Sequence, residues 1–137
     1  MANNYFQWST EICGLTPDER SWWKQALERT DRDLSGVDFD FFAEVKDETA
    51  DQEDQPSRRL HIYSEESGSL EDTVDLIEAF FKEFRTDAVL AVEWASTCSK
   101  MRVGEFGGGA VIIRASGSVW FSTEGWVRQQ LKGTEDR

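Results

Sequence analysis

The clearest helical pattern in the chain begins with a capping signal and continues as a spaced apolar stripe. Thr16, Pro17 and Glu19 form the start signature of a helix over 16–29, with Pro at the first helical position and Glu three residues after the cap. Ser69 is expected to cap a second helix that runs to Arg85. Its apolar residues recur at steps of three and four, with Phe80 at the edge of the stripe: Leu70, Val74, Ile77, Phe81 and Phe84. A third, short helix is expected over 124–132.

Strand patterns occupy most of the remaining chain. The segments with alternating or continuous apolar residues are 37–45, 58–64, 88–94, 110–114 and 119–121. The first two predict a hairpin whose tip is the acidic, flexible segment 46–57, and 88–94 has the continuous pattern of a strand covered on both faces. Residues 1–14 are expected to form a short extended arm.

This order of elements, α-β-β-α-β-β-β-α, predicts a fold class. Consecutive hairpins favour a mixed or mostly antiparallel sheet, with the helices packed on one face. We therefore expect a single α+β domain over 1–137, with a disordered polar tail at 134–137. The length of 137 residues, with 39% hydrophobic residues, is enough for a core without a disulfide or metal.

The net charge of the chain limits the classes of partner that it is expected to bind. A net charge of −12, from 27 acidic and 15 basic residues, has the wrong sign for binding phosphates or an anionic membrane. Basic proteins are the expected partners, although acidity can also serve solubility alone. Two cysteines, Cys13 and Cys98, do not make a disulfide framework, and the chain shows neither a signal peptide nor an apolar run of about 18 residues. A cytoplasmic protein without membrane contact is expected.

The segment 97–109 concentrates the candidate chemistry. It combines the Cys98 thiol with Lys100, Arg102, Glu105, Phe106 and three consecutive glycines. The two cations could lower the pKa of Cys98 and make it a nucleophile, with His61 as the one imidazole that could serve as its base. The alternative is structural: Cys98 is a small buried residue, Glu105 pairs with Arg102, and the glycines form a bulge. No metal, ATP or NAD motif is present, so no cofactor is expected.

A second candidate site is acidic. Glu71, Asp75 and Glu78 fall on one side of the helix that Ser69 begins, and Asp51, Glu53 and Asp54 cluster in the hairpin tip. Carboxylates about 6 Å apart along a helix could imitate a nucleic-acid backbone, which makes a DNA mimic a hypothesis. The alternative is an ordinary solvated helix face.

Several stretches of this chain resemble a group of proteins found in mobile elements of bacteria. The run EWASTCSKMRVGEFGGGAVII, followed by VWFSTEGWV, is similar to sequences of short, acidic, mostly uncharacterised proteins carried by bacteriophages. The likeness also covers LTPDERSWW and LHIYSEESGSLEDTVDLIEAFFKEFRTD. The resemblance brings no catalytic residues with it. It implies a phage-encoded accessory protein, such as an inhibitor of host defence of the anti-CRISPR or anti-restriction type.

The leading hypothesis is therefore a non-enzymatic protein that blocks a basic surface of a host nucleic-acid-binding protein. Its contacts would come from the acidic residues above, with Arg102, Glu105 and Phe106 as a second surface. One alternative is a small enzyme centred on Cys98. The other is a structural or self-associating protein, for instance a dimer, since some of the six tryptophans could form an exposed patch.

Overall fold

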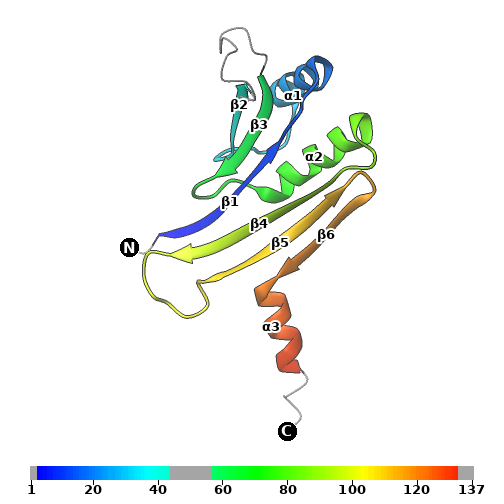
Figure 1. Cartoon of the computed structure of the whole chain (residues 1–137). Coiled ribbons are helices and arrows are strands. Elements are labelled where there is room, and N and C mark those ends of the chain that lie inside the picture. Colours follow the sequence, from blue (N-terminus) through cyan, green and yellow to red (C-terminus); the bar gives the residue numbers. More distant parts are fainter. Residues whose placement is uncertain (1–2, 44–56, 133–137) are drawn as a thin grey trace, which may run out of the picture.

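Nine elements follow one another in the computed structural model, which describes residues 3–43 and 57–132 (Figure 1). They are β1 (Asn4–Ile12), α1 (Pro17–Arg29), β2 (Asp38–Ala43), β3 (Ser57–Ser64), α2 (Leu70–Phe84), β4 (Val89–Cys98), β5 (Gly107–Arg114), β6 (Gly117–Ser122) and α3 (Thr123–Lys132). The strands make one antiparallel sheet in the order β2-β3-β1-β4-β5-β6. The prediction of a single α+β domain is confirmed. The loop predicted over 46–57 lies outside the described residues, apart from Ser57, and so does the tail at 134–137.

The N-terminal segment departs most from the sequence-based prediction. It is not a short arm but the long strand β1, which pairs with both β3 and β4, so that Trp8 lies opposite Ser64 on one side and Trp94 on the other. Phe6, Trp8 and Ile12 point to the helical side of the sheet, but polar Thr10 takes the fourth inward position. That polar residue interrupts the apolar alternation of the segment. With β1 added as a strand, the observed order of elements is β-α-β-β-α-β-β-β-α.

The two long helices begin where their capping residues predict. In α1 the Thr16 hydroxyl accepts a hydrogen bond from the Glu19 N–H at 3.1 Å, and the Glu19 carboxylate accepts one from the Thr16 N–H at 2.9 Å. In α2 the Ser69 hydroxyl accepts a bond from the Asp72 N–H at 3.1 Å. Phe80 was predicted at the edge of the apolar stripe of α2, but in the structure its side chain is completely buried.

Both long helices pack on one face of the sheet and form the core there (Figure 1). Its fully buried large side chains come from both layers: Trp23, Phe80, Ile77, Leu60, Ile62 and Ile113. Phe80 lies at the centre, with the rings of Trp22 and Trp23 at 5.5 and 5.4 Å between centroids. Aromatic contacts of this kind stabilise a core beyond their buried area, so these rings help to hold α1 and α2 together.

An ion pair fixes the junction between the two helices. Arg85, which ends α2, donates from Nε to Glu19 Oε2 at 2.7 Å, and from Nη2 to the carbonyls of Cys13 and Gly14 at 2.9 and 3.2 Å. Burial by itself would raise the pKa of Glu19. The hydrogen bonds from Arg85 and Thr16, together with the Arg85 charge, outweigh burial and lower this pKa below its usual value.

The opposite face of the sheet is open. Val92 of β4 is buried against the helices, whereas Val89, Ala91 and Glu93 on the other face are exposed. The prediction that 88–94 is covered on both faces is therefore wrong, because α1 and α2 both lie on the same side. The third helix, α3, covers neither face: it leaves the end of β6, runs beyond the sheet (Figure 1) and has no buried side chain.

Candidate functional site

A groove of about 1260 Å³ lies where the helical layer ends before the sheet does. The lower ends of β1, β4 and β5 extend past the start of α2, and their helix-side face is left uncovered there (Figure 1). The floor of the groove is aromatic and comes from three strands: Phe6, Trp94 and Trp120. Phe6 and Trp94 pack with their ring centroids 5.3 Å apart. The floor is thus an apolar surface at the end of an otherwise covered face.

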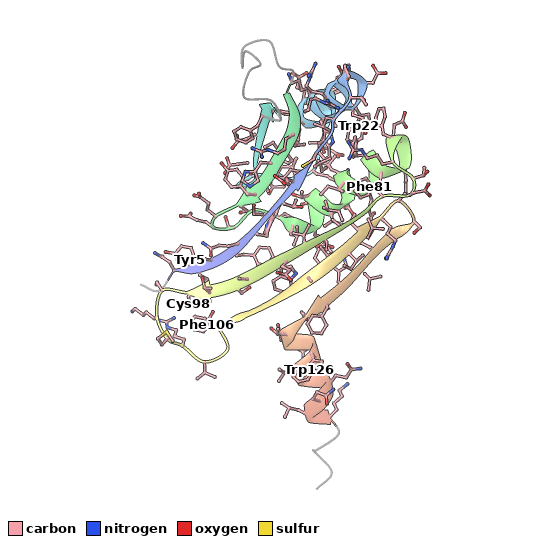
Figure 2. The ribbon with its side chains drawn as sticks, in the orientation of Figure 1. Tyr5, Trp22, Phe81, Cys98, Phe106 and Trp126 are labelled. Carbon is pink, nitrogen blue, oxygen red and sulfur yellow. The ribbon has the colours of Figure 1, made fainter. Side chains whose placement is uncertain are left out.

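Three segments form the walls of the groove. The turn before α2 and its first residues, 66–71, make one wall, and the end of the β4–β5 loop, residues 104–107, makes the second. The third wall is α3, through Val127, Arg128 and Leu131. Figure 2 shows Phe106 at the loop end of the sheet, where its half-exposed ring lies beside the floor.

The rim of the groove carries excess negative charge. Four carboxylates line it, those of Glu66, Glu71, Glu105 and Glu124, against one cation, Arg128. Arg128 Nη2 donates to Glu124 Oε1 at 2.6 Å, so this cation is already neutralised within α3. The three remaining carboxylates lie on the turn before α2, on α2 itself and on the β4–β5 loop. In the described part of the chain none of these three carboxylates forms an ion pair, so the apolar floor is bordered on two sides by negative charge that no cation there neutralises.

The three consecutive glycines explain how the floor is built. The prediction that they form a loop or a bulge is wrong, because they begin β5. In unbroken register with β4, they lie opposite three of its residues: Gly107 opposite Ser96, Gly108 opposite Ala95 and Gly109 opposite Trp94. A Cβ at Gly109 would clash with the Phe121 carbonyl oxygen of β6 and would come within 2.5 Å of the Trp94 ring. A glycine is needed here because both groups lie directly against the β5 backbone, and the close approach of the Trp94 indole lets it form part of the floor.

The β4–β5 loop is shorter than the sequence indicated, residues 99–106. Its tip, including Met101 and Val103, is fully exposed, and Gly104 has φ +85°, a conformation that favours glycine. Glu105 and Phe106 line the groove, whereas Arg102 does not. Among the described residues no ion pair joins Arg102 to Glu105. Two of the three predicted contact residues of this loop therefore belong to the groove.

The structure does not bring the predicted cysteine and histidine together. Cys98 pairs with Asn4 at one end of β1 and is buried on the helical face, whereas His61 pairs with Glu11 at the other end, on the open face. Asn4 and Glu11 are seven positions apart in β1, which is about 23 Å along the strand. His61 is held at Nε2 by the Ser9 hydroxyl at 2.7 Å and stacks on Tyr63. A dyad between Cys98 and His61 is therefore not formed.

The three acidic residues predicted to form a row on α2, Glu71, Asp75 and Glu78, have different environments in the structure. Glu71 lines the groove, but Asp75 pairs with Arg32 at 3.6 Å and Glu78 accepts a hydrogen bond from the Ser118 hydroxyl. A continuous row of free carboxylates is therefore not present on this helix. The supporting residues of the predicted row lie outside the described part of the chain: Asp51, Glu53 and Asp54.

The aromatic floor was missed by the sequence analysis, although part of its signal was present. Phe6 and Trp8 alternate in 4–12, and Trp94 and Trp120 each lie on a predicted strand. Their common face could not be assigned without the strand order, since β1 lies between β3 and β4. The empty space above them arises because α2 begins short of the strand ends. The position of this helix on the sheet cannot be predicted from the sequence.

Other kinds of site find no support in the described residues. Within 3–43 and 57–132 no three His, Cys, Asp or Glu side chains are grouped so that they could hold a metal ion. No helix in these ranges is long and apolar enough to cross a membrane.

Comparison with protein-family models, with curated proteins and with solved structures finds no match to this chain.

Proposed function

We propose that this chain is a non-catalytic binding protein that holds a basic segment of a partner protein in the groove between α2, α3 and the β4–β5 loop. One observation carries the proposal: an aromatic floor of Phe6, Trp94 and Trp120 is bordered by three carboxylates that form no ion pair with any other described residue. Aromatic surfaces supply most of the binding energy at protein interfaces, and charge at their rims gives orientation and association rate.

The size of the groove favours a peptide segment over a small molecule. Small-molecule pockets usually enclose about 300–1,000 Å³ and bury most of the ligand. This groove is larger, at about 1260 Å³, and is wide and bounded by separate segments of the chain. A partner segment with one or two aromatic or aliphatic anchors would fill the floor. Flanking lysines or arginines would reach Glu66, Glu71 and Glu105.

The charge of the whole chain supports the same class of partner. A net charge of −12 raises the rate at which a basic surface meets the protein, and it repels acidic competitors. Nucleic-acid-binding proteins present clustered arginines and lysines together with exposed aromatic rings. We therefore propose a host nucleic-acid-binding protein as the partner, blocked by occupation of its basic surface.

The experiment uses a fluorescein-labelled probe peptide in which Lys and Arg alternate with pairs of Trp and Leu. Its affinity for the full chain is measured by fluorescence anisotropy at low and at high salt. Two variants change the groove, Glu71→Lys at the rim and Phe106→Ser beside the floor; both positions are solvent-exposed, so folding is preserved. The matched control is Asp75→Lys, which makes the same charge change one turn further along α2, outside the groove.

The two groove variants are expected to weaken binding by about tenfold or more each, which corresponds to roughly 1.4 kcal/mol. Asp75→Lys should change the affinity by less than about threefold, because its charge lies outside the groove and is screened there, and the Arg32 pair that it breaks is exposed and weak. A probe with Ser in place of Trp and Leu should not bind. Equal losses in Glu71→Lys and Asp75→Lys would show that general acidity, and not the groove, attracts the probe.

A further inference from the structure

The two edges of the sheet are protected very differently. The β2 edge carries Asp38 and Asp40, and its pairing with β3 is irregular between Phe42 and Ala43. Charged side chains and bulges are the usual means by which proteins prevent a sheet edge from pairing with another chain. The opposite edge, β6, has the sequence GSVWFS, with no charged residue and no proline, and its register with β5 is unbroken.

The unprotected edge is also strongly apolar. The side chains of Val119, Trp120 and Phe121 are exposed by 66, 45 and 51%. In the described part of the chain, β6 forms backbone hydrogen bonds with β5 only, so the groups on its other side are free to pair. Figure 1 shows that α3 continues from the end of β6 and does not run alongside this free edge. A regular, uncharged strand in this position is a template for one more strand.

A second copy of the same chain fits this edge best. Two identical strands pair antiparallel about a two-fold axis without any other complementarity, because the interface uses the same surface on both sides. Most of the surface of a chain with charge −12 repels a second copy, but β6 itself carries no charge. Pairing centred on Trp120 keeps side chains of the same face opposite each other, with Val119 opposite Phe121 of the second copy.

We propose that the protein forms a two-fold dimer through antiparallel pairing of β6 with β6, which joins the two six-stranded sheets into one. The pairing satisfies the free backbone groups of the edge and brings Val119 and Phe121 of the two copies into contact. The proposal does not rest on the proposed function, because the pairing uses the backbone groups at the free edge of β6. The two sites are adjacent, however, since the Trp120 side chain belongs to the floor of the groove. The area of the dimer interface is small, so a dissociation constant in the micromolar range is expected.

Sedimentation velocity of the full chain tests the dimer, between about 5 and about 300 µM, which brackets the affinity expected of a small interface. The wild type should shift with concentration from 15.7 kDa to twice that mass. Val119→Lys places a charge on the edge and should leave a monomer at every concentration. The matched control is Val89→Lys, since Val89 has a similar exposure of 57% on the same open face, but in β4. Circular dichroism confirms that each variant is folded.

Each outcome decides the proposal. A dimer in the wild type and in Val89→Lys, with a monomer in Val119→Lys, supports edge pairing. A monomeric wild type at about 300 µM overturns it. If both variants are monomeric, the copies associate through the open face of the sheet, and edge pairing is wrong.

A cross-linking measurement reads the register directly. Trp120→Cys, in a Cys13→Ser background that removes the exposed native thiol, should give a covalent dimer with a short bis-maleimide cross-linker, because directly opposite strand residues have their Cβ atoms only about 4.5–5.5 Å apart. Phe106→Cys in the same background, an aromatic position of similar exposure outside β6, should remain monomeric. Equal cross-linking of the two variants would indicate random collision and would contradict the register.

Discussion

Replacement of Arg85 by alanine should destabilise the fold far more than loss of a surface ion pair. The Arg85 side chain is 28% exposed, while that of Glu19 is only 6% exposed, so removal of Arg85 leaves a carboxylate buried without its counter-charge. A hydrogen bond to a charged group contributes about 1.5–3 kcal/mol, and breaking a buried pair costs about 3–5 kcal/mol. Because Arg85 is partly solvated, we expect a loss near the lower limit, about 3 kcal/mol.

The matched control is Arg128→Ala. Its ion pair with Glu124 has an N···O distance of 2.6 Å, slightly shorter than the 2.7 Å between Arg85 and Glu19. The two side chains are 70 and 80% exposed, however, and an exposed pair at this helical spacing contributes about 0.3–0.5 kcal/mol. Burial, and not distance, therefore decides the difference between the two variants.

Urea unfolding followed by tryptophan fluorescence measures both variants, with an unchanged m value as the check on two-state behaviour. At neutral pH a loss of about 3 kcal/mol should lower Tm by roughly 10 °C in a chain of this size. A loss in Arg85→Ala as small as that in Arg128→Ala would refute the reasoning.

The pH dependence gives the same prediction a second test. The folded-state pKa of Glu19 is lowered relative to the unfolded chain, where it is about 4.3. The Glu19 contribution is therefore fully present above that value and is lost as the pH falls through the folded pKa. The difference in stability between wild type and Arg85→Ala should shrink at acid pH. A difference that stays constant down to acid pH would show that Arg85 acts through its packing and its bonds to the carbonyls of Cys13 and Gly14, and not through the Glu19 charge.

The remaining predictions concern single sites. Gly109→Ala should cost about 1–3 kcal/mol by overpacking, whereas Gly107→Ala, which has more space, should not; equal urea midpoints would contradict this. Ser69→Ala removes the cap of α2 and should cost about 1 kcal/mol in the same assay. The hydrogen bond to Asp40, with burial and nearby carboxylates, raises the pKa of Tyr63, so Asp40→Asn should lower the Tyr63 midpoint in an ultraviolet pH titration. An unchanged midpoint would mean that the hydrogen bond is not formed.

The parts of the fold that could be predicted from sequence are those with local signals. The capping box and Pro17 define the start of α1, and the spacing from Leu70 to Phe81 defines α2 and its buried face. The β2–β3 hairpin also follows from its two alternating segments, although its tip lies outside the described residues. These signals depend only on residues close together in the sequence, so the elements that they predict do not depend on the order of the strands.

The parts that failed depend on contacts between distant segments. The strand β1 was not identified as central because Thr10 interrupts its apolar alternation, and its place between β3 and β4 is a property of the whole sheet. The glycines at 107–109 were interpreted as a loop, but they begin β5, and Gly109 leaves room for the Trp94 ring of the neighbouring strand. Tertiary packing determines the conformation of glycines, so their sequence pattern alone was ambiguous.

The candidate site shows the same division. Glu71, Glu105 and Phe106 were identified by charge and by their position in a distinctive segment, and they do lie together at the groove. The floor residues Phe6 and Trp120 come from the first and last strands of the chain. Their proximity required the full strand order. A site assembled from such distant segments leaves little trace in the local sequence pattern.

The most direct test of the groove is a ¹⁵N–¹H NMR titration of the full chain with the basic, Trp- and Leu-containing probe peptide. Our account predicts that the shifted amide signals gather at the groove walls, in residues 66–71, 104–107 and the start of α3. Signals of Asp40, His61 and Tyr63, on the open face and far from the groove, should not move. Shifts confined to the open face, or spread evenly over the acidic surface, would contradict the assignment of the groove as the binding site.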